Sequence, residues 1–225
     1  MKVISDTFGW LTTADHWWGS DGIVHRLAQH AQYSIEALVL ACIIALPIGL
    51  TIGHSRRFAF LALNGAGIAR ALPTFGLLVL VFRIEPLALW PVLLVLVVLA
   101  APSILANTYA GIVSVDPDVV DAARGMGMTA RQTLWRVEIP LALPLILTGI
   151  RSAATQLIAT ATIAAYVALG GLGRFIVDGL SVRGYYVVVG GAVLVATLAL
   201  ISEGLFALAI IFARRALGAT LSPRG

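Results

Sequence analysis

The sequence has little charge, one lysine and one cysteine. Only 12% of its 225 residues are charged, whereas 60% are hydrophobic and the mean hydropathy is +0.97. A soluble domain carries about 25% charged residues, and one water-soluble core of this size does not bury so much apolar surface. The composition therefore indicates an integral membrane protein. It excludes disordered, collagen-like and disulfide-scaffold classes.

The scarcity of lysine, cysteine and histidine excludes several kinds of site. A P-loop requires a lysine in its glycine-rich turn, and Lys2 is the only lysine. Cys42 alone forms no internal disulfide or thiolate cluster. We therefore expect no P-loop nucleotide site and no metal site in this chain. The histidines make no HExxH pair, and we interpret all four as polar residues near a membrane boundary: His16, His25, His30 and His54.

Five apolar stretches are long enough to cross a bilayer, which takes about 20 residues each. They lie near 31–53, 59–82, 87–110, 144–169 and 186–212. The sequence therefore predicts an all-α, polytopic membrane helix bundle of about five transmembrane helices. Proline and glycine interrupt these stretches, as at Pro47 with Gly49 and Pro73 with Gly76. Such breaks fit either helix packing, with Gly49 and Gly53 at GxxxG spacing, or a flexing pathway.

The basic residues indicate an orientation. Placing the N-terminus outside puts eight of the 15 basic residues in cytoplasmic segments: Arg56, Arg57, Arg124, Arg131, Arg136, Arg214, Arg215 and Arg224. The outer segments then carry Lys2, Arg26, Arg83, Arg174 and Arg183. The positive-inside rule favours this N-out, C-in arrangement. The same rule explains the basic residues better than a nucleic-acid surface does. Residues 1–27, rich in tryptophan, are predicted as an interfacial lead-in outside the cell membrane, and residues 213–225 as a cytoplasmic tail.

The polar segment between the third and fourth stretches has its own helix signals. It reads SVDPDVVDAARGMGMTARQTLWRVEIPLALP. Asp116 before Pro117 is a helix N-cap followed by a first-position proline. Gly125 and Gly127 end this first helix. Thr129, with Gln132 three residues on, forms a capping box for a second helix, which Pro140 is expected to close. The sequence therefore predicts two capped helices in the cytoplasmic loop 113–140.

This loop resembles the EAA motif of type I ABC importer permeases. The motif reads Glu-Ala-Ala, three residues, Gly, nine residues, Ile-x-Leu-Pro. The same gaps separate Asp121-Ala122-Ala123, Gly127 and Val137-Glu138-Ile139-Pro140 here. Asp121, Val137 and Ile139 are mild departures from Glu, Ile and Leu. The branch that transports glycine betaine, choline and carnitine is similar also at residues 30–49, 71–74, 149–151 and 160–173. The resemblance spans roughly 28–212, the expected permease domain.

The resemblance implies a non-catalytic subunit of a multi-pass bacterial membrane transporter. The loop would form a coupling helix that docks on a separate ATPase, which binds the ATP and Mg²⁺. The residues implied in this contact are Asp121, Ala122, Ala123, Gly127, Val137, Ile139 and Pro140. Small alanines permit close approach to a partner, and glycine permits the turn. The other implied partners are a second permease, identical or paralogous, an extracytoplasmic substrate-binding protein and the lipid bilayer, with no nucleic acid.

Three ionisable residues lie at similar depth within the expected spans: Arg70, Arg151 and Glu203. Charges inside a membrane are costly and face the bundle interior. We expect a charge pair between Glu203 and an arginine, with Arg151 favoured, or else a gate. Phe75, Phe82 and Tyr166 either pack in the core or present a π face to a quaternary ammonium ion.

The predicted function is an ABC importer permease that moves a small osmoprotectant by alternating access. The alternatives are a permease for another solute such as an amino acid, a secondary transporter acting alone, and a membrane scaffold. A lone secondary transporter needs an ion relay and no docking loop, so the capped loop helices disfavour it. The proline and glycine breaks disfavour a scaffold.

Overall fold

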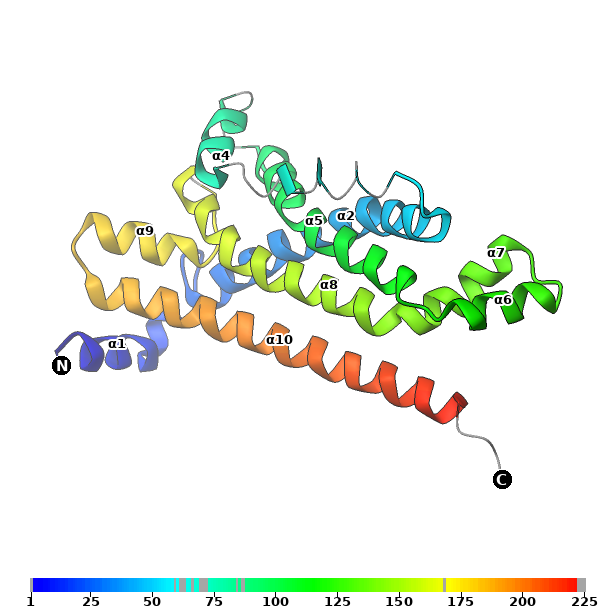
Figure 1. Cartoon of the computed structure of the whole chain (residues 1–225). Helices are drawn as coiled ribbons and strands as arrows, with labels where there is room; N and C mark the ends of the chain where they lie inside the picture. The colour runs from blue at the N-terminus through cyan, green and yellow to red at the C-terminus, as the bar shows by residue number, and fades with distance from the viewer. Residues whose placement is uncertain are drawn as a thin grey trace. The chain divides into compact units, whose positions relative to one another are not determined.

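The computed structural model describes residues 2–58, 60, 64–65, 67–68, 73–83, 85, 88–167 and 169–221. Within these ranges the regular secondary structure is helical (Figure 1). In chain order the elements are α1 (Lys2–Thr12), η1 (Ala14–His16), α2 (Ile23–Ser55), α4 (Thr74–Phe82), α5 (Trp90–Val113), α6 (Pro117–Gly125), α7 (Ala130–Thr133), η2 (Leu134–Glu138), α8 (Ile139–Thr160), η3 (Ala161–Val167), α9 (Gly173–Ser181) and α10 (Tyr185–Leu221).

Among the described residues, four helical segments are long and apolar enough to cross a membrane. They are Ile23–Ser55, Trp90–Val113, Ala130–Val167 and Tyr185–Gly218. They contain most of the predicted spans 31–53, 87–110, 144–169 and 186–212. Much of the predicted span 59–82 falls outside the described residues, and its last part is the nine-residue helix α4.

The described chain forms two compact units. Unit 1 comprises residues 1–39, 72–100 and 154–202, and unit 2 comprises residues 40–71, 101–153 and 203–225. Each of the helices α2, α5, α8 and α10 contributes residues to both units. The basic residues expected outside belong to unit 1, and the described arginines expected inside belong to unit 2.

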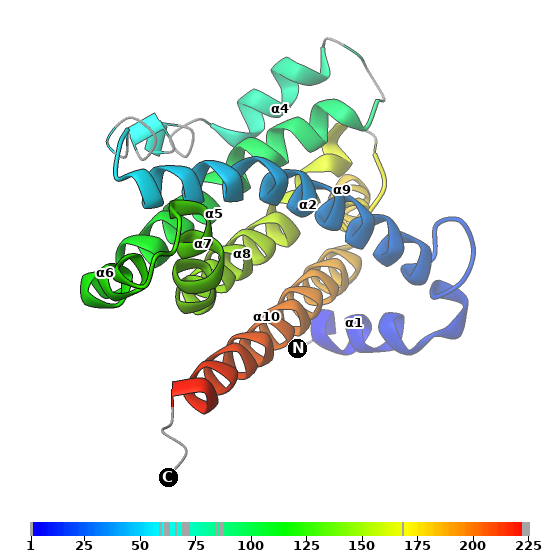
Figure 2. The same cartoon turned by 90° about the vertical axis from the view of Figure 1, so that its right-hand side faces the viewer.

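In unit 1, α1 and α9 pack against the first turns of α10 (Figure 2). Thr7 donates a hydrogen bond to the carbonyl of Tyr186 at 3.1 Å. A Cβ at Gly190 would lie 2.7 Å from the ring of Trp10, so only glycine admits this tryptophan. Trp10 is buried, whereas Trp18 is exposed. The lead-in is therefore anchored to α10 by Trp10.

His30, interpreted from the sequence as a residue near a membrane boundary, is fully buried in unit 1. Its Nε2 lies 2.9 Å from the carbonyl oxygen of Ile158. The local sequence pattern does not predict this long-range contact between the ring and a backbone carbonyl. An apolar cluster of this unit contains Ile158, Leu172 and Val195.

In unit 2, glycines bring three helices into close contact. Cβ atoms at Gly49 and Gly53 of α2 would lie 2.8 Å from the Cβ atoms of Thr108 and Ile112 on α5. Gly111 of α5 likewise packs on Ala142 of α8, and Gly149 of α8 on Asn107 of α5. Without a hydrophobic driving force in lipid, such close approach supplies the packing energy between helices. This supports the packing interpretation of Gly49 and Gly53.

The predicted charge pair is present in unit 2. Arg151 of α8 donates from Nε to Oε1 of Glu203 on α10 at 2.7 Å, and its Nη2 also contacts this oxygen. The side chains are 34% and 36% exposed, so the pair is half-buried in the single chain. Arg70, the other candidate partner, lies outside the described residues.

The glycine contact in unit 2 gives a stability prediction. Gly53→Ala should lower the free energy of unfolding by about 1–3 kcal/mol, because Ile112 Cβ is fixed to its backbone and does not swing aside. Gly204→Ala on α10 is the matched control, since its new Cβ meets no atom within 4 Å among the described residues. Thermal unfolding in detergent measures both. Equal midpoints for the two variants would contradict the prediction.

The Arg151–Glu203 pair gives a coupling prediction. Glu203→Gln should lower the unfolding midpoint because it weakens both bonds from Arg151. Arg151→Gln in the same chain should restore part of the loss, since no uncompensated charge is left. A double-mutant cycle in thermal unfolding measures the coupling. The exposed pair Arg124 and Asp121, 3.9 Å apart, is the control. Additive effects of the two changes would exclude the pair as a stabilising contact.

Candidate functional site: the polar loop of unit 2

The loop between α5 and α8 begins with a capped helix. Asp116 accepts a hydrogen bond from the backbone N–H of Asp118 at 2.9 Å, and Pro117 opens α6. A proline in this position loses no helical hydrogen bond, since the first N–H groups of a helix have no acceptor. These are the N-cap and the first-turn proline predicted from the sequence.

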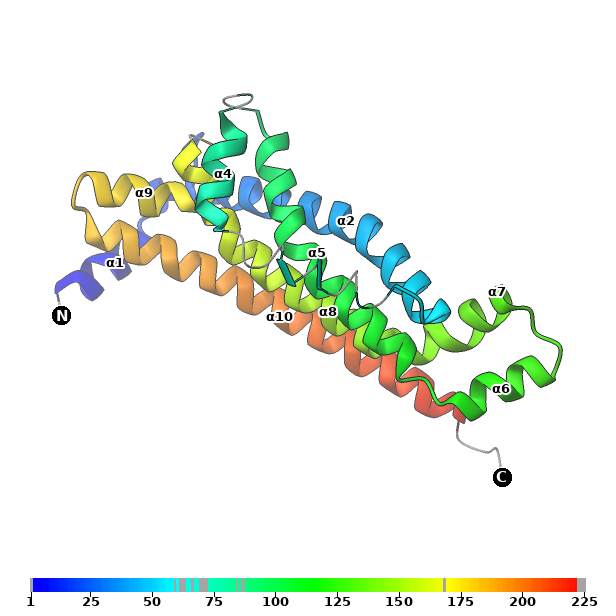
Figure 3. The same ribbon diagram turned by 45° about the horizontal axis from the view of Figure 1, so that its top comes forward.

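A glycine turn ends α6. The N–H groups of Met126 and Gly127 bond to the carbonyls of Ala122 and Arg124, and that of Met128 bonds to Ala123. Gly127 has φ of +84°, a conformation that is costly for a residue with a Cβ. The predicted helix stop and the predicted turn at Gly127 are both confirmed. The turn reverses the chain so that α7 lies beside α6 (Figure 3).

The second helix begins as predicted and ends differently. Thr129 and Gln132 form the reciprocal capping box, with bonds of 2.8 and 3.3 Å. Pro140, however, does not close this helix: the chain passes from α7 through the π-helical turn η2 into α8, and Pro140 lies within α8. The wider π turn directly precedes Pro140. It changes the backbone hydrogen-bond pattern at the point where the proline ring would clash with a carbonyl of a regular α-helix.

The two faces of α6 differ. Val120 and Ala123 are buried, Val120 in an apolar cluster with Ile112, Val115, Ala142 and Ile146. Asp121 and Ala122 are exposed. The expectation that Ala123 contacts a partner was wrong, since its side chain is 2% exposed and faces the chain's own core. The outer face of the loop also exposes Val119, Met126 and Trp135.

The last predicted loop residues lie at the end of η2 and the start of α8. Val137, Ile139 and Pro140 are partly buried. Ile139 packs against the same apolar cluster as Val120. The residue just before the motif, Val120, and the motif residue Ile139 therefore contact the same apolar cluster.

A charged pocket lies under α6, and sequence reasoning missed it. The pocket has a volume of about 180 Å³ and is lined by Gly53, His54, Arg56, Ile112, Val115, Pro117, Val120, Asp121, Arg124 and Glu138. In its wall, Nδ1 of His54 lies 2.6 Å from Oε2 of Glu138. These two residues are 84 positions apart, so no local sequence pattern predicts their contact.

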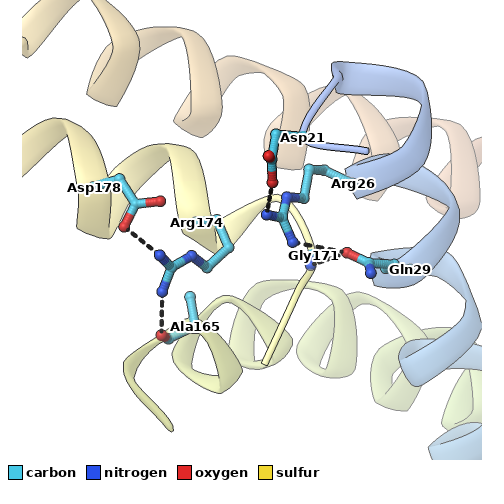
Figure 4. A network of polar contacts seen from close by, with 7 residues as sticks. All are labelled: Asp21, Arg26, Gln29, Ala165, Gly171, Arg174 and Asp178. Carbon is cyan, nitrogen blue, oxygen red and sulfur yellow. Dashed lines mark hydrogen bonds and ion pairs between the residues drawn. The ribbon is translucent and has the colours of Figure 1, made fainter. Parts of the chain in front are cut away.

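In unit 1, the glycine segment 170–173, which carries part of the resemblance, contacts α2 (Figure 4). Oε1 of Gln29 accepts from the N–H of Gly171 at 3.0 Å and from Nη1 of Arg26 at 3.1 Å. Asp21 pairs with Arg26. A Cβ at Gly173 would lie 2.1 Å from the carbonyl oxygen of Thr162, so glycine is required there.

The same glycine segment leads into a second polar contact. Arg174 pairs with Asp178 of α9 at 2.7 Å and donates to the carbonyl of Ala165 at 3.4 Å (Figure 4). Residues 170–173 are thus held between α2 and the 3₁₀ helix η3 by side chains that bond to backbone groups.

Comparisons with known proteins agree with these features. Residues 41–216 match the family described as binding-protein-dependent transport system inner membrane component. The carnitine transport permease protein OpuCB of Listeria monocytogenes is 35% identical over 175 residues, which cover 78% of this chain and 80% of the relative. The glycine betaine/carnitine/choline permease OpuCB of Bacillus subtilis is 33% identical over 181 residues, covering 80% and 83%.

A solved structure shows the same fold. The inward-facing MetNI methionine ABC transporter aligns with a TM-score of 0.75 and 21% identity, covering 85% of this chain and 95% of that chain. The family model matches most of the chain, including the whole capped loop. The protein is therefore a permease subunit of an ABC-type importer, an all-α protein of the inner membrane that belongs to the binding-protein-dependent transport system inner membrane components.

Proposed function

We propose that this chain forms the membrane pathway of an osmoprotectant importer that accepts a small quaternary ammonium compound. Its relatives carry the names of carnitine, choline and glycine betaine permeases. The proposed partners are a second permease, ATPase subunits that bind the ATP and Mg²⁺, and an extracytoplasmic binding protein. The permease itself carries out no catalysis.

The observation that carries the coupling proposal is the outer face of the α6–α7 loop. It combines rigid caps at Asp116 and Thr129, a glycine turn at Gly127 and an exposed apolar and acidic surface. Docking on an ATPase needs a helix fixed to its own bundle on one side and open on the other. Val120 supplies the first contact, and Ala122 leaves the second face without a bulky side chain.

Alternating access follows from this arrangement. ATP binding brings two ATPase subunits together and moves the loops docked on them, which shifts the bundle between inward-open and outward-open states. Hydrolysis reverses the shift. The residues assigned to this contact are Asp121, Ala122 and Gly127 at the surface, with Val137, Ile139 and Pro140 joining the loop to α8.

An aromatic pair in unit 1 supports the substrate class. The rings of Phe75 and Tyr166 lie 5.5 Å apart in an edge-to-face arrangement. They are 51% and 56% exposed, so neither is a core residue in the single chain. Aromatic faces bind quaternary ammonium groups through their quadrupole. The side chain of Phe82, the third aromatic candidate, lies outside the described part.

The orientation is N-out and C-in in this proposal. The permease domain spans 28–212 with the coupling loop at 113–140, the lead-in 1–27 lies outside and the tail 213–225 lies inside. The division of basic residues between the two units supports this orientation, since unit 2 contains the loop arginines Arg124, Arg131 and Arg136. Positive charge favours the cytoplasmic side.

Uptake by the reconstituted complex tests the function. The permease is co-expressed with its ATPase and binding protein, purified, and placed in vesicles with radiolabelled glycine betaine, choline, carnitine or methionine. We expect ATP-dependent uptake of at least one of the first three. Uptake of methionine alone would identify the alternative amino-acid permease. Uptake without any bound ATPase would identify a transporter acting alone.

Gly127→Val should uncouple this complex. A β-branched residue at φ of +84° costs about 1–2 kcal/mol. This cost lowers the population of the productive loop conformation by roughly 5–30-fold. Uptake should fall by that factor while membrane insertion is unchanged. Gly125→Val is the matched control, because Gly125 is exposed, is not among the residues of positive φ and has open space around its Cβ position. Normal uptake by Gly127→Val would disprove the role of the turn.

Cysteine labelling tests the orientation. On a Cys42→Ser background, a cysteine replacing Ala130 should react with a membrane-impermeant reagent only from the cytoplasm, and one replacing Leu180 only from outside. Both positions are exposed, so accessibility of the side chain does not limit the reaction. The reverse labelling pattern would overturn the orientation and, with it, the docking of the loop.

A further inference from the structure

Glu138 is a carboxylate buried within the coupling motif. It is the last residue of the π turn η2 and is 5% exposed. A buried carboxylate is costly unless a donor compensates it. Nδ1 of His54 provides that donor at 2.6 Å, from the last turn of α2. This hydrogen bond therefore joins the end of α2 to the π turn that leads into α8.

The other contacts at this end of α2 are of a different kind. Gly49 and Gly53 approach Thr108 and Ile112 on α5 through methyl and methine groups. These are van der Waals contacts between closely fitted surfaces and include no hydrogen bond. A hydrogen bond to a carboxylate is directional and is stronger than one between neutral groups. Among these contacts, the His54–Glu138 bond is the directional one, and it links α2 to the π turn before α8.

The charged groups around the bond connect it to the coupling helix. Asp121 and Arg124 of α6 and Arg56, just beyond α2, line the same pocket as His54 and Glu138. A displacement of α6 therefore acts on the wall that contains this bond. The backbone path from α6 through the π turn to Glu138 is helical from Ala130 onward.

We propose that the His54–Glu138 bond makes the end of α2 follow the coupling loop, so that both residues are positioning residues for transport. The proposal rests on the proposed docking of this loop on an ATPase. In this role the bond converts motion of α6 and η2 into motion of the first span. Losing it leaves ATP hydrolysis intact and lowers the amount of substrate moved per ATP.

The test compares transport with hydrolysis in the vesicle-reconstituted complex. The double variant His54→Leu/Glu138→Leu removes both polar groups, so no unpaired charge remains. We expect its uptake per ATP to fall at least about five-fold, measured with whichever of radiolabelled glycine betaine, choline or carnitine the wild type accumulates. His54→Gln, which keeps a donor, should retain most of the wild-type ratio. His25→Leu, which removes an exposed histidine from the same helix, is the control.

The outcomes separate a positioning role from a merely structural one. A double variant that binds the ATPase and keeps the wild-type ratio overturns the proposal, whatever its melting temperature. If the double variant does not assemble, Glu138→Gln decides: a two- to three-fold lower ratio supports the proposal, and an unchanged ratio overturns it. If the wild-type permease binds no ATPase, the proposed function fails instead.

A distance measurement tests the motion without any substrate. Spin labels replace Thr51 on α2 and Ala130 at the start of α7, both exposed, on the Cys42→Ser background with excess unlabelled permease. In the wild type, the distance within one subunit should stay the same when ATP is added, because α2 follows the loop. In the double variant it should shift or broaden. An ATP-dependent shift in the wild type would overturn the proposal.

Discussion

Close approach of helix backbones at small residues is the constraint on which unit 2 depends. Helices in lipid gain little from burying apolar side chains against each other, because the lipid is equally apolar. Gly49 and Gly53 bring α2 against α5, and Gly111 and Gly149 bring α5 and α8 together. The His54–Glu138 bond joins α2 to the turn before α8, and these are two of the helices that the glycines bring together.

Polar contacts then select one arrangement among those that close packing permits. Arg151 bonds to Glu203 between α8 and α10, and His54 bonds to Glu138 between α2 and the π turn. Unit 1 uses the same device, with Gln29 bonded to the backbone of Gly171. In a chain with so few charged residues, each such bond adds a directional contact between helices whose other contacts are mostly apolar.

The sequence predicted those features that depend on neighbouring residues. The caps at Asp116 and Thr129 and the turn at Gly127 arise from local backbone chemistry, so their spacing was sufficient. The Arg151–Glu203 contact followed from depth and opposite charge. The sequence did not predict the His54–Glu138 contact, because this contact requires α2 to lie close to its neighbouring helices. Gly53 permits that approach by leaving room for Ile112 of α5. Ala123 and Pro140 were misread because tertiary burial and the π turn override local preference.

The π turn has a consequence for how the loop and the membrane helix are aligned. A π turn is equivalent to one residue inserted into an α-helix, and one residue corresponds to about 100° of rotation. The turn Leu134–Glu138 thus offsets the side of α7 that carries Arg131 from the side of α8 that carries Ala142 and Ile146. Deleting a single residue here would leave the segment helical with nearly the same composition. It would nevertheless rotate the whole loop about the helix axis relative to the bundle. At this point the number of residues matters as well as their identity.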